Sequence, residues 1–160
     1  MHKLQKKDKG FLVIDVGPKK FRSGHIEYKG ERQEMEDATV IFGNIPSENY
    51  YYFAVFDGHG GNKAAHFAGK KMHESFKNHF VQNNDSDVFK ALKSAFLEIN
   101  RQLVRRPSNE GCAAGIIVVS NEKVYSCNLG DVRAVMVYPD GTFERISHDH
   151  RACDPEERIF

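Results

Sequence analysis

The stretch that decides the fold is YYFAVFDGHGG, at residues 51–61. Its apolar and aromatic beginning is typical of a buried strand, and we expect a strand over Tyr50–Phe56. A second β-rich run, Ala38–Gly43, precedes it, and the Pro and Asn residues of the segment 44–49 suit a hairpin connection. The glycines that follow Asp57 permit backbone angles closed to other residues and let the main chain approach an ion or a phosphate. The two runs predict an antiparallel hairpin with a functional end.

Working outward from this hairpin, the pattern changes to helices and then back to strands. Apolar or small residues recur at intervals of three or four over Asn62–Val81, and again from Val88 to Leu103, which predicts two amphipathic helices. Further strands are expected over Phe11–Val16, around His25–Tyr28, and over Gly115–Ser120, Lys123–Asn128, Val132–Tyr138 and Thr142–Ser147, the last four as a meander. Strands, then helices, then strands indicate an α+β fold with helices outside an antiparallel sheet.

Composition narrows the class of protein. The 160 residues suit one domain, and 23 Lys and Arg against 22 Asp and Glu give no basic field to attract nucleic acid or a membrane. The first ten residues are lysine-rich, and the apolar run after them is too short for a signal peptide or a membrane span. Cys112, Cys127 and Cys153 are odd in number, and we interpret them as reduced packing residues. We therefore expect a cytoplasmic protein, a nuclear location being compatible too.

Carboxylates gather at one end of the predicted hairpin. Glu36 and Asp37 precede its first strand and Asp57 follows its second, so that pairing would bring Glu36 opposite Asp57. Carboxylates so close repel one another unless they are neutralised, and a hard divalent cation with oxygen ligands is the usual solution. The carbonyl of Gly58 could add a further ligand. The pattern predicts a magnesium or manganese site.

Two more side chains fit this chemistry. His59 would lie beside the metal, and a histidine exchanges protons near neutral pH, which makes it a candidate general acid. The guanidinium of Arg32, four residues before Glu36, suits bidentate binding of a tetrahedral phosphate. Taken singly, an Asp-Gly pair usually marks a turn and adjacent acids a solvated strand end. Metal, arginine and acid together indicate phosphoryl-transfer chemistry.

The run His148-Asp149-His150 also has residue types that bind metals. It ends a predicted strand, and a hydrogen-bonded turn is the commoner explanation for such a run. We therefore leave these three residues outside the predicted metal site.

Several motifs resemble those of the type-2C (PPM) metal-dependent serine/threonine protein phosphatases. Arg32-Gln-Glu-Met-Glu-Asp37 is similar to the R-x-x-M-E-D signature of that family, and Phe53–Gly61 is similar to its F-x-V-F-D-G-H-G-G segment. Asn128–Ala134 resembles N-x-G-D-S-R-A, and Ile146–Ile159 resembles S-x-D-H-x-x-x-x-x-E-x-x-R-I. The resemblance implies residues 1–20 as a lysine-rich extension and 21–160 as the amino-terminal part of the catalytic domain, an antiparallel β-sandwich with flanking helices in four α-β-β-α layers.

The resemblance also implies roles for single residues. Asp57 would bridge two Mg²⁺ or Mn²⁺ ions, with Glu36 and the Gly58 carbonyl completing one ion's protein ligands. Asp37 would hold metal-bound water, and Asp131 would match the family's accessory third-metal aspartate. Arg32 would bind the phosphate, and His59 would protonate the departing serine or threonine oxygen. The implied reaction is hydrolysis of phosphoserine and phosphothreonine in signalling proteins by metal-activated water.

Departures from the family pattern keep other interpretations open. Val132 stands where the family usually has serine, and Gly111-Cys-Ala-Ala114 replaces G-S-T-A. The sequence given stops at Phe160, before the family's later aspartates, so we expect this chain to bind metal weakly and to have low activity. The alternatives are a non-catalytic module that binds phosphoproteins through the Arg32 pocket, and a fragment that folds as an oligomer or with a partner through uncovered sheet edges.

Overall fold

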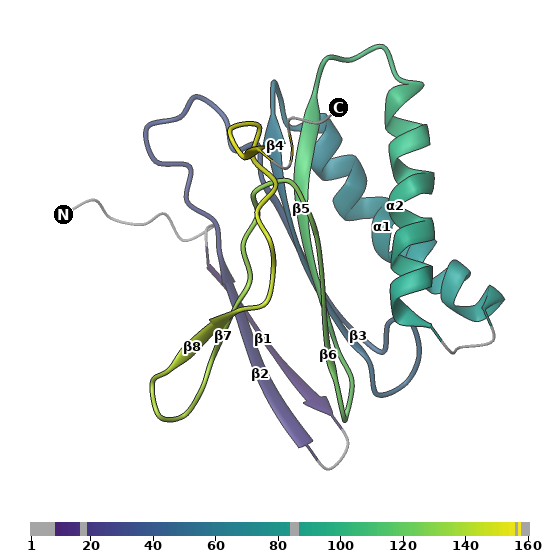
Figure 1. Ribbon diagram of the computed structural model, residues 1–160, viewed down its shortest axis with the longest axis vertical. Helices are drawn as coiled ribbons and strands as arrows, with labels where there is room; N and C mark the ends of the chain where they lie inside the picture. The colour runs from purple at the N-terminus through teal and green to yellow at the C-terminus, as the bar shows by residue number, and fades with distance from the viewer. Residues whose placement is uncertain (1–8, 17–18, 84–86, 156, 158–160) are drawn as a thin grey trace.

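A computed structural model describes residues 9–16, 19–83, 87–155 and 157 of the chain, and gives side-chain surroundings from residue 23 onward. At its centre is an antiparallel four-stranded sheet in the order β3-β4-β5-β6. These strands are β3 (Ala38–Gly43), β4 (Tyr51–His59), β5 (Gly111–Val119) and β6 (Val124–Leu129). Two helices, α1 (Lys63–Gln82) and α2 (Val88–Val104), cover one face of this sheet (Figure 1).

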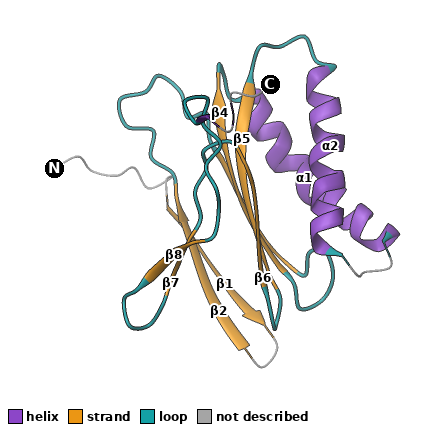
Figure 2. Ribbon diagram, in the orientation of Figure 1, coloured by secondary structure: helices purple, strands orange, loops and turns teal. Residues whose placement is uncertain are grey.

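Two smaller two-stranded sheets lie on the side of the central sheet that the helices leave open (Figure 2). One pairs β1 (Lys9–Val16) with β2 (Lys19–Ile26), and the other pairs β7 (Val135–Val137) with β8 (Phe143–Arg145). The α+β class, with an antiparallel sheet and flanking helices, is thereby confirmed. The predicted domain boundary after residue 20 stays a prediction. Within the predicted extension 1–20, residues 1–8 and 17–18 lie outside the described part of the chain.

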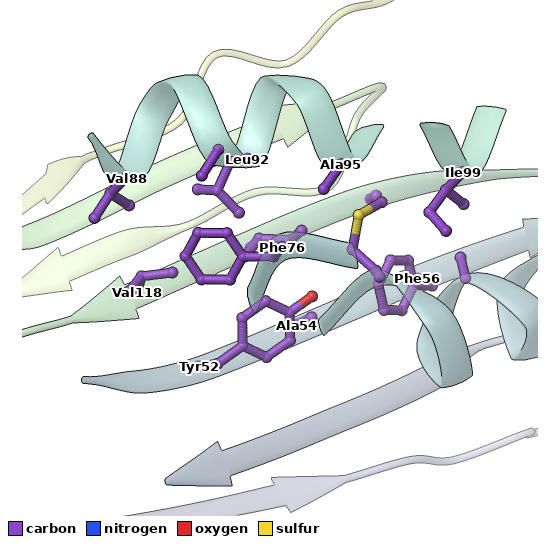
Figure 3. Packing of buried hydrophobic residues seen from close by; sticks show 14 of the residues in the cluster. Tyr52, Ala54, Phe56, Phe76, Val88, Leu92, Ala95, Ile99 and Val118 are labelled. Atoms are coloured by element: carbon purple, nitrogen blue, oxygen red, sulfur yellow. The ribbon is translucent and has the colours of Figure 1, made fainter. Parts of the chain in front are cut away.

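The core lies between the helices and the central sheet. The side chains of Phe56 from β4, Phe76 from α1 and Leu92 from α2 are fully buried and converge there (Figure 3). They meet because α1 and α2 each carry one apolar stripe, which must be covered to leave water. Asp87 begins α2 by accepting a hydrogen bond from the Lys90 backbone nitrogen at 2.9 Å. This face of the sheet supplies the stability of the fold.

From Ala54 onward, strand β4 alternates between buried and exposed residues. Tyr52, Ala54 and Phe56 are at most 3% exposed on the helix side. Val55 is 40% exposed, and Asp57 points to the same open side of the sheet as Val55. The period of two therefore divides the strand into one face for packing and one for other chemistry.

Several predicted boundaries were wrong in ways that share a cause. Strand β4 continues through Asp57 and Gly58 to His59, because β5 begins at Gly111, four residues earlier than expected, and pairs with all of them. Strand β2 ends at Ile26, before the predicted stretch His25–Tyr28 is complete. Hydrogen bonding to a neighbouring strand, which local sequence does not reveal, sets these ends.

The predicted meander of four strands was also wrong. The pairing β5-β6 exists, but after Leu129 the chain leaves the central sheet, and β7 and β8 pair only with each other. Gly130 makes this departure possible, since its φ of +88° is a conformation that side chains disfavour.

Among the cysteines, Cys112 and Cys127 pack against the core as predicted, whereas Cys153 is exposed. No helix in the described part of the chain has the length and apolar character to span a membrane.

Candidate metal and phosphate site

A polar cleft of about 310 Å³ lies at the end of the sheet where β4 finishes. One wall is the segment between β2 and β3, and the other is the end of β4. Its lining residues are Tyr28, Lys29, Arg32, Glu34, Met35, Glu36, Asp37, Asp57 and Gly58. The structure therefore brings together five of the residues that the sequence marks for metal or phosphate binding: Arg32, Glu36, Asp37, Asp57 and Gly58.

The pairing of the acids differs by one residue from the prediction. The ladder pairs Ala38 with Phe56. Continued beyond the end of β3, this register sets Asp37 opposite Asp57 and Glu36 opposite Gly58, so the predicted pair of Glu36 with Asp57 was wrong. A methyl group built on Gly58 would lie only 2.3 Å from the carbonyl oxygen of Glu36. Glycine at position 58 thus lets the two main chains touch at the floor of the cleft.

The acids in the cleft disturb one another. Burial raises the pKa of the Asp37 carboxyl, and the negative charge of Asp57 raises it further. Glu27 and Glu36 act in the same direction, whereas Arg32 opposes them. A divalent cation would remove this repulsion, and the donors are oxygen atoms of the kind that Mg²⁺ and Mn²⁺ prefer. The donor set fits such an ion, although within the described residues no group of three or more His, Cys, Asp or Glu side chains is already arranged around one point.

His59 ends β4 on the open side of the sheet and is exposed. It does not line the cleft, but it lies two residues beyond Asp57 on the same face, a rise of about 7 Å. Its ring covers Gly111 of β5, where a methyl group would lie 2.4 Å from the His59 Nε2. The cross-strand pairing of His59 with Gly111 therefore leaves room for the imidazole beside the cleft.

The glycine turn after His59 is held by Glu110, the residue before β5. Gly61 has a φ of +139°, and a methyl group there would collide with the side chain of Glu110. That carboxylate accepts a hydrogen bond from the Lys63 backbone nitrogen at 2.7 Å and pairs with the Lys63 ammonium at 3.2 Å. Glu110 thus satisfies the start of α1 and closes the turn.

Asp131 lies outside the cleft. It is exposed and follows Gly130, which lies against Ala113 of β5. Ala113 in turn pairs with Asp57. Gly130 is therefore displaced from Asp57 across the sheet by about two strand spacings, roughly 10 Å, and Asp131 follows Gly130 outside the central sheet.

The sequence does not single out two residues of the cleft wall, Tyr28 and Lys29. Lys29 Nζ donates a hydrogen bond to the Gln33 carbonyl at 3.3 Å, and the Arg32 backbone nitrogen donates to the Lys29 carbonyl. Their position in the sequence could have indicated them, because Lys29 and Tyr28 precede Arg32 by only three and four residues. The His148–His150 run does not form the predicted hydrogen-bonded turn, because residues 148–150 have no turn conformation and the His150 backbone nitrogen donates instead to the distant Gly130 carbonyl at 2.9 Å.

Comparison with known proteins assigns the chain to a family. The family described as Protein phosphatase 2C matches residues 21–159. Protein phosphatase 2C homolog 1 of Saccharomyces cerevisiae is 33% identical over 161 residues, which cover 86% of this chain and 56% of that protein. The integrin-linked kinase-associated serine/threonine phosphatase 2C of Homo sapiens is 30% identical over 157 residues, covering 83% of this chain and 40% of that protein. The chain belongs to the protein phosphatase 2C family, and it spans about half the length of the curated relatives it matches.

Solved structures support the same fold. A sex determining protein of C. elegans superposes with a TM-score of 0.70 at 17% sequence identity, covering 94% of this chain and 36% of that one. The PPM Ser-Thr phosphatase MsPP of Mycobacterium smegmatis, solved in complex with cacodylate, gives a TM-score of 0.53 at 20% identity, covering 89% of this chain and 52% of that one. At these identities the likeness establishes the fold alone.

Proposed function

We propose that this chain is the amino-terminal part of a metal-dependent phosphatase that hydrolyses phosphoserine and phosphothreonine in proteins. The observation that carries the proposal is the cleft in which Arg32 faces the acids Glu36, Asp37 and Asp57. Acids alone would repel a phosphate, and an arginine alone would not activate water. Their combination in a chain of the protein phosphatase 2C family supports phosphate ester hydrolysis.

The metal would be Mg²⁺ or Mn²⁺, bound in the cleft by Glu36, Asp37, Asp57 and the carbonyl of Gly58. Asp131, which does not line the cleft, would serve an accessory ion. When bound, such an ion supplies a Lewis acid and lowers the pKa of water. Burial raises the pKa of Asp37, and the negative charges of Asp57, Glu27 and Glu36 raise it further, a repulsion that a bound dication would relieve.

Arg32 and His59 would act on the substrate. Arg32 is exposed at the wall of the cleft, so its planar guanidinium can donate two hydrogen bonds to a phosphate entering from solvent. His59 would give a proton to the departing serine or threonine oxygen, because an alkoxide is a poor leaving group. Both residues lie on the open side of the sheet, where a polypeptide substrate has access. We further propose phosphoprotein signalling in the cytoplasm as the setting of this activity.

Calorimetric titration with Mn²⁺ tests the site. Asp57→Asn should weaken Mn²⁺ binding at least tenfold, since it removes the central charge of the cleft. The matched control is Asp140→Asn, which makes the same chemical change in the exposed turn between β7 and β8 and should bind like the parent. Equal affinity of parent and Asp57→Asn would place the metal elsewhere and remove the basis of the proposal.

A further inference from the structure

A second charged cluster lies apart from the cleft, around the buried side chain of Asp149. That side chain is only 6% exposed, yet three arginines contact it. Arg133 Nη2 lies 2.5 Å from Oδ2, Arg145 Nη2 lies 2.8 Å from Oδ1, and Arg151 Nη2 lies 3.1 Å from Oδ2. Three arginines of the segment 133–151 thus bring their cationic groups to one point.

The cluster carries more positive charge than the fold requires. One guanidinium would neutralise the carboxylate of Asp149, and the second and third leave an excess of two positive charges. Their side chains are 45%, 48% and 50% exposed, so much of each guanidinium faces solvent. Within the described residues Asp149 is the only acidic side chain paired with them. Each guanidinium has five N–H donors, and most of these stay free for a ligand.

The buried aspartate also fixes where the cations point. The hydrogen bond from Arg133, together with the charges of Arg133, Arg145 and Arg151, lowers the pKa of Asp149 to about 2, although burial of the carboxyl acts in the opposite direction. Asp149 is therefore ionised at neutral pH and orients the arginines. A dianion such as a phosphate monoester matches both the excess charge and the fork geometry of guanidinium groups.

The cluster lies on the same side of the sheet as the cleft. Gly130, three residues before Arg133, contacts Ala113, the ladder partner of Asp57. The segment after β8 returns to the end of the sheet where β4 finishes, opposite the helices (Figure 1). Two strand spacings separate Gly130 from Asp57, about 10 Å. An extended peptide of about three to six residues covers that distance and somewhat more.

We propose that Arg133, Arg145 and Arg151 form a second phosphate site, which holds a further phosphorylated side chain of a polypeptide. The polypeptide part of this inference rests on the proposed function, since its first phosphate would lie in the Arg32 cleft. The preferred substrate is then a protein segment phosphorylated at two positions a few residues apart.

Fluorescence anisotropy with non-hydrolysable peptides tests this inference. The peptides carry two phosphonate analogues of phosphoserine four residues apart, one analogue, or none, and the buffer contains Mn²⁺. The parent chain should bind the doubly substituted peptide about tenfold more tightly than the singly substituted one. Arg145→Gln with Arg151→Gln should abolish this preference, while the remaining pair of Arg133 with Asp149 keeps the local fold.

The matched control is Lys90→Gln with Lys93→Gln, which removes the same charge from the exposed face of α2 and should keep the preference. Equal binding of the two peptides by the parent, or an equal loss in the control, would overturn the proposal. If the double variant is unfolded by circular dichroism, Arg151→Gln alone must still reduce the preference several-fold.

Two further arms separate other ligands. Inorganic phosphate that shifts the arginine Nε–H resonances, with no advantage for the doubly substituted peptide, would assign the site to free phosphate and contradict the proposal. Binding to phosphatidylserine vesicles in place of peptide, lost in the double variant, would contradict it too. Hydrolysis assays run in parallel keep the two ideas distinct. A preference without hydrolysis would leave the second site standing, and hydrolysis without a preference would leave only the catalytic proposal.

Discussion

The two faces of the central sheet differ in what they do, and β4 contributes to both. On the helix side Tyr52 and Phe56 are completely buried among apolar neighbours. On the open side Val55 is 40% exposed, and the positions that follow on that face carry Asp57 and His59. Core packing and the proposed site are thus carried by alternate residues of one strand. This division lets Asp57 and His59 stay near solvent without interrupting the core.

The largest expected difference in stability is between substitutions at two adjacent positions of β4, one on each face of the sheet. Phe56→Ala should lower the free energy of unfolding by about 3–5 kcal/mol, because it opens a cavity in the core. Val55→Ala, one residue away on the open face, should lower it by less than about 1 kcal/mol. Urea denaturation of both variants measures the contrast, and similar losses would show that the open face is packed in solution.

The complementary change affects chemistry and spares stability. His59→Gln should slow phosphate release from a phosphothreonine peptide by about a hundredfold. The same variant should hydrolyse p-nitrophenyl phosphate at nearly the rate of the parent, because the leaving group of that substrate needs no proton. The urea midpoint should stay unchanged because the His59 side chain is exposed. Equal losses on the two substrates would argue against a general acid at this position.

Alanine substitutions at two glycines should differ by a smaller amount in stability, and should also differ in their effect on turnover. Gly58→Ala should destabilise the fold by about 1–3 kcal/mol, since its methyl group would meet the rigid main chain of Glu36. Gly111→Ala meets only the mobile ring of His59, and should reduce phosphothreonine turnover while changing stability by less than about 1 kcal/mol. Thermal denaturation and turnover of both variants provide the measurements, and a reversal of their order would contradict the assigned contacts.

The smallest expected effect is a loss of stability that is absent at neutral pH and appears only in acid. The pKa of Asp149 in the folded chain, about 2, lies below its ordinary value of 3.8. Its contribution to stability is therefore complete above pH 3.8 and is lost as the pH falls towards 2. Melting temperatures recorded from pH 5 to pH 2 should show this loss in the parent and lack it in Asp149→Asn. A parallel decline in both proteins would mean that Asp149 is not the group responsible.

Local patterns sufficed for much of the fold. The spacing of apolar residues predicted α1 and α2 within two residues of their observed ends, because a helix is closed by bonds between near neighbours in the sequence. The hairpin of β3 and β4 followed from two β-rich runs and a turn between them. The grouping of Arg32, Glu36, Asp37 and Asp57 at one cleft was predictable for the same reason, since one hairpin positions most of them.

Features that depend on distant partners needed the tertiary structure. The register that pairs Ala38 with Phe56, and the continuation of β4 to His59, depend on hydrogen bonds of β4 to β3 and β5. The sequence contains Asp149 in an ordinary-looking turn, and nothing nearby indicates that Arg133, sixteen residues earlier, would reach it. Sequence by itself determined the periodicities and the residue types that meet at the cleft. Only the tertiary structure decided which residues face each other, because strand register and charge clusters arise from contacts between segments that local propensity does not encode.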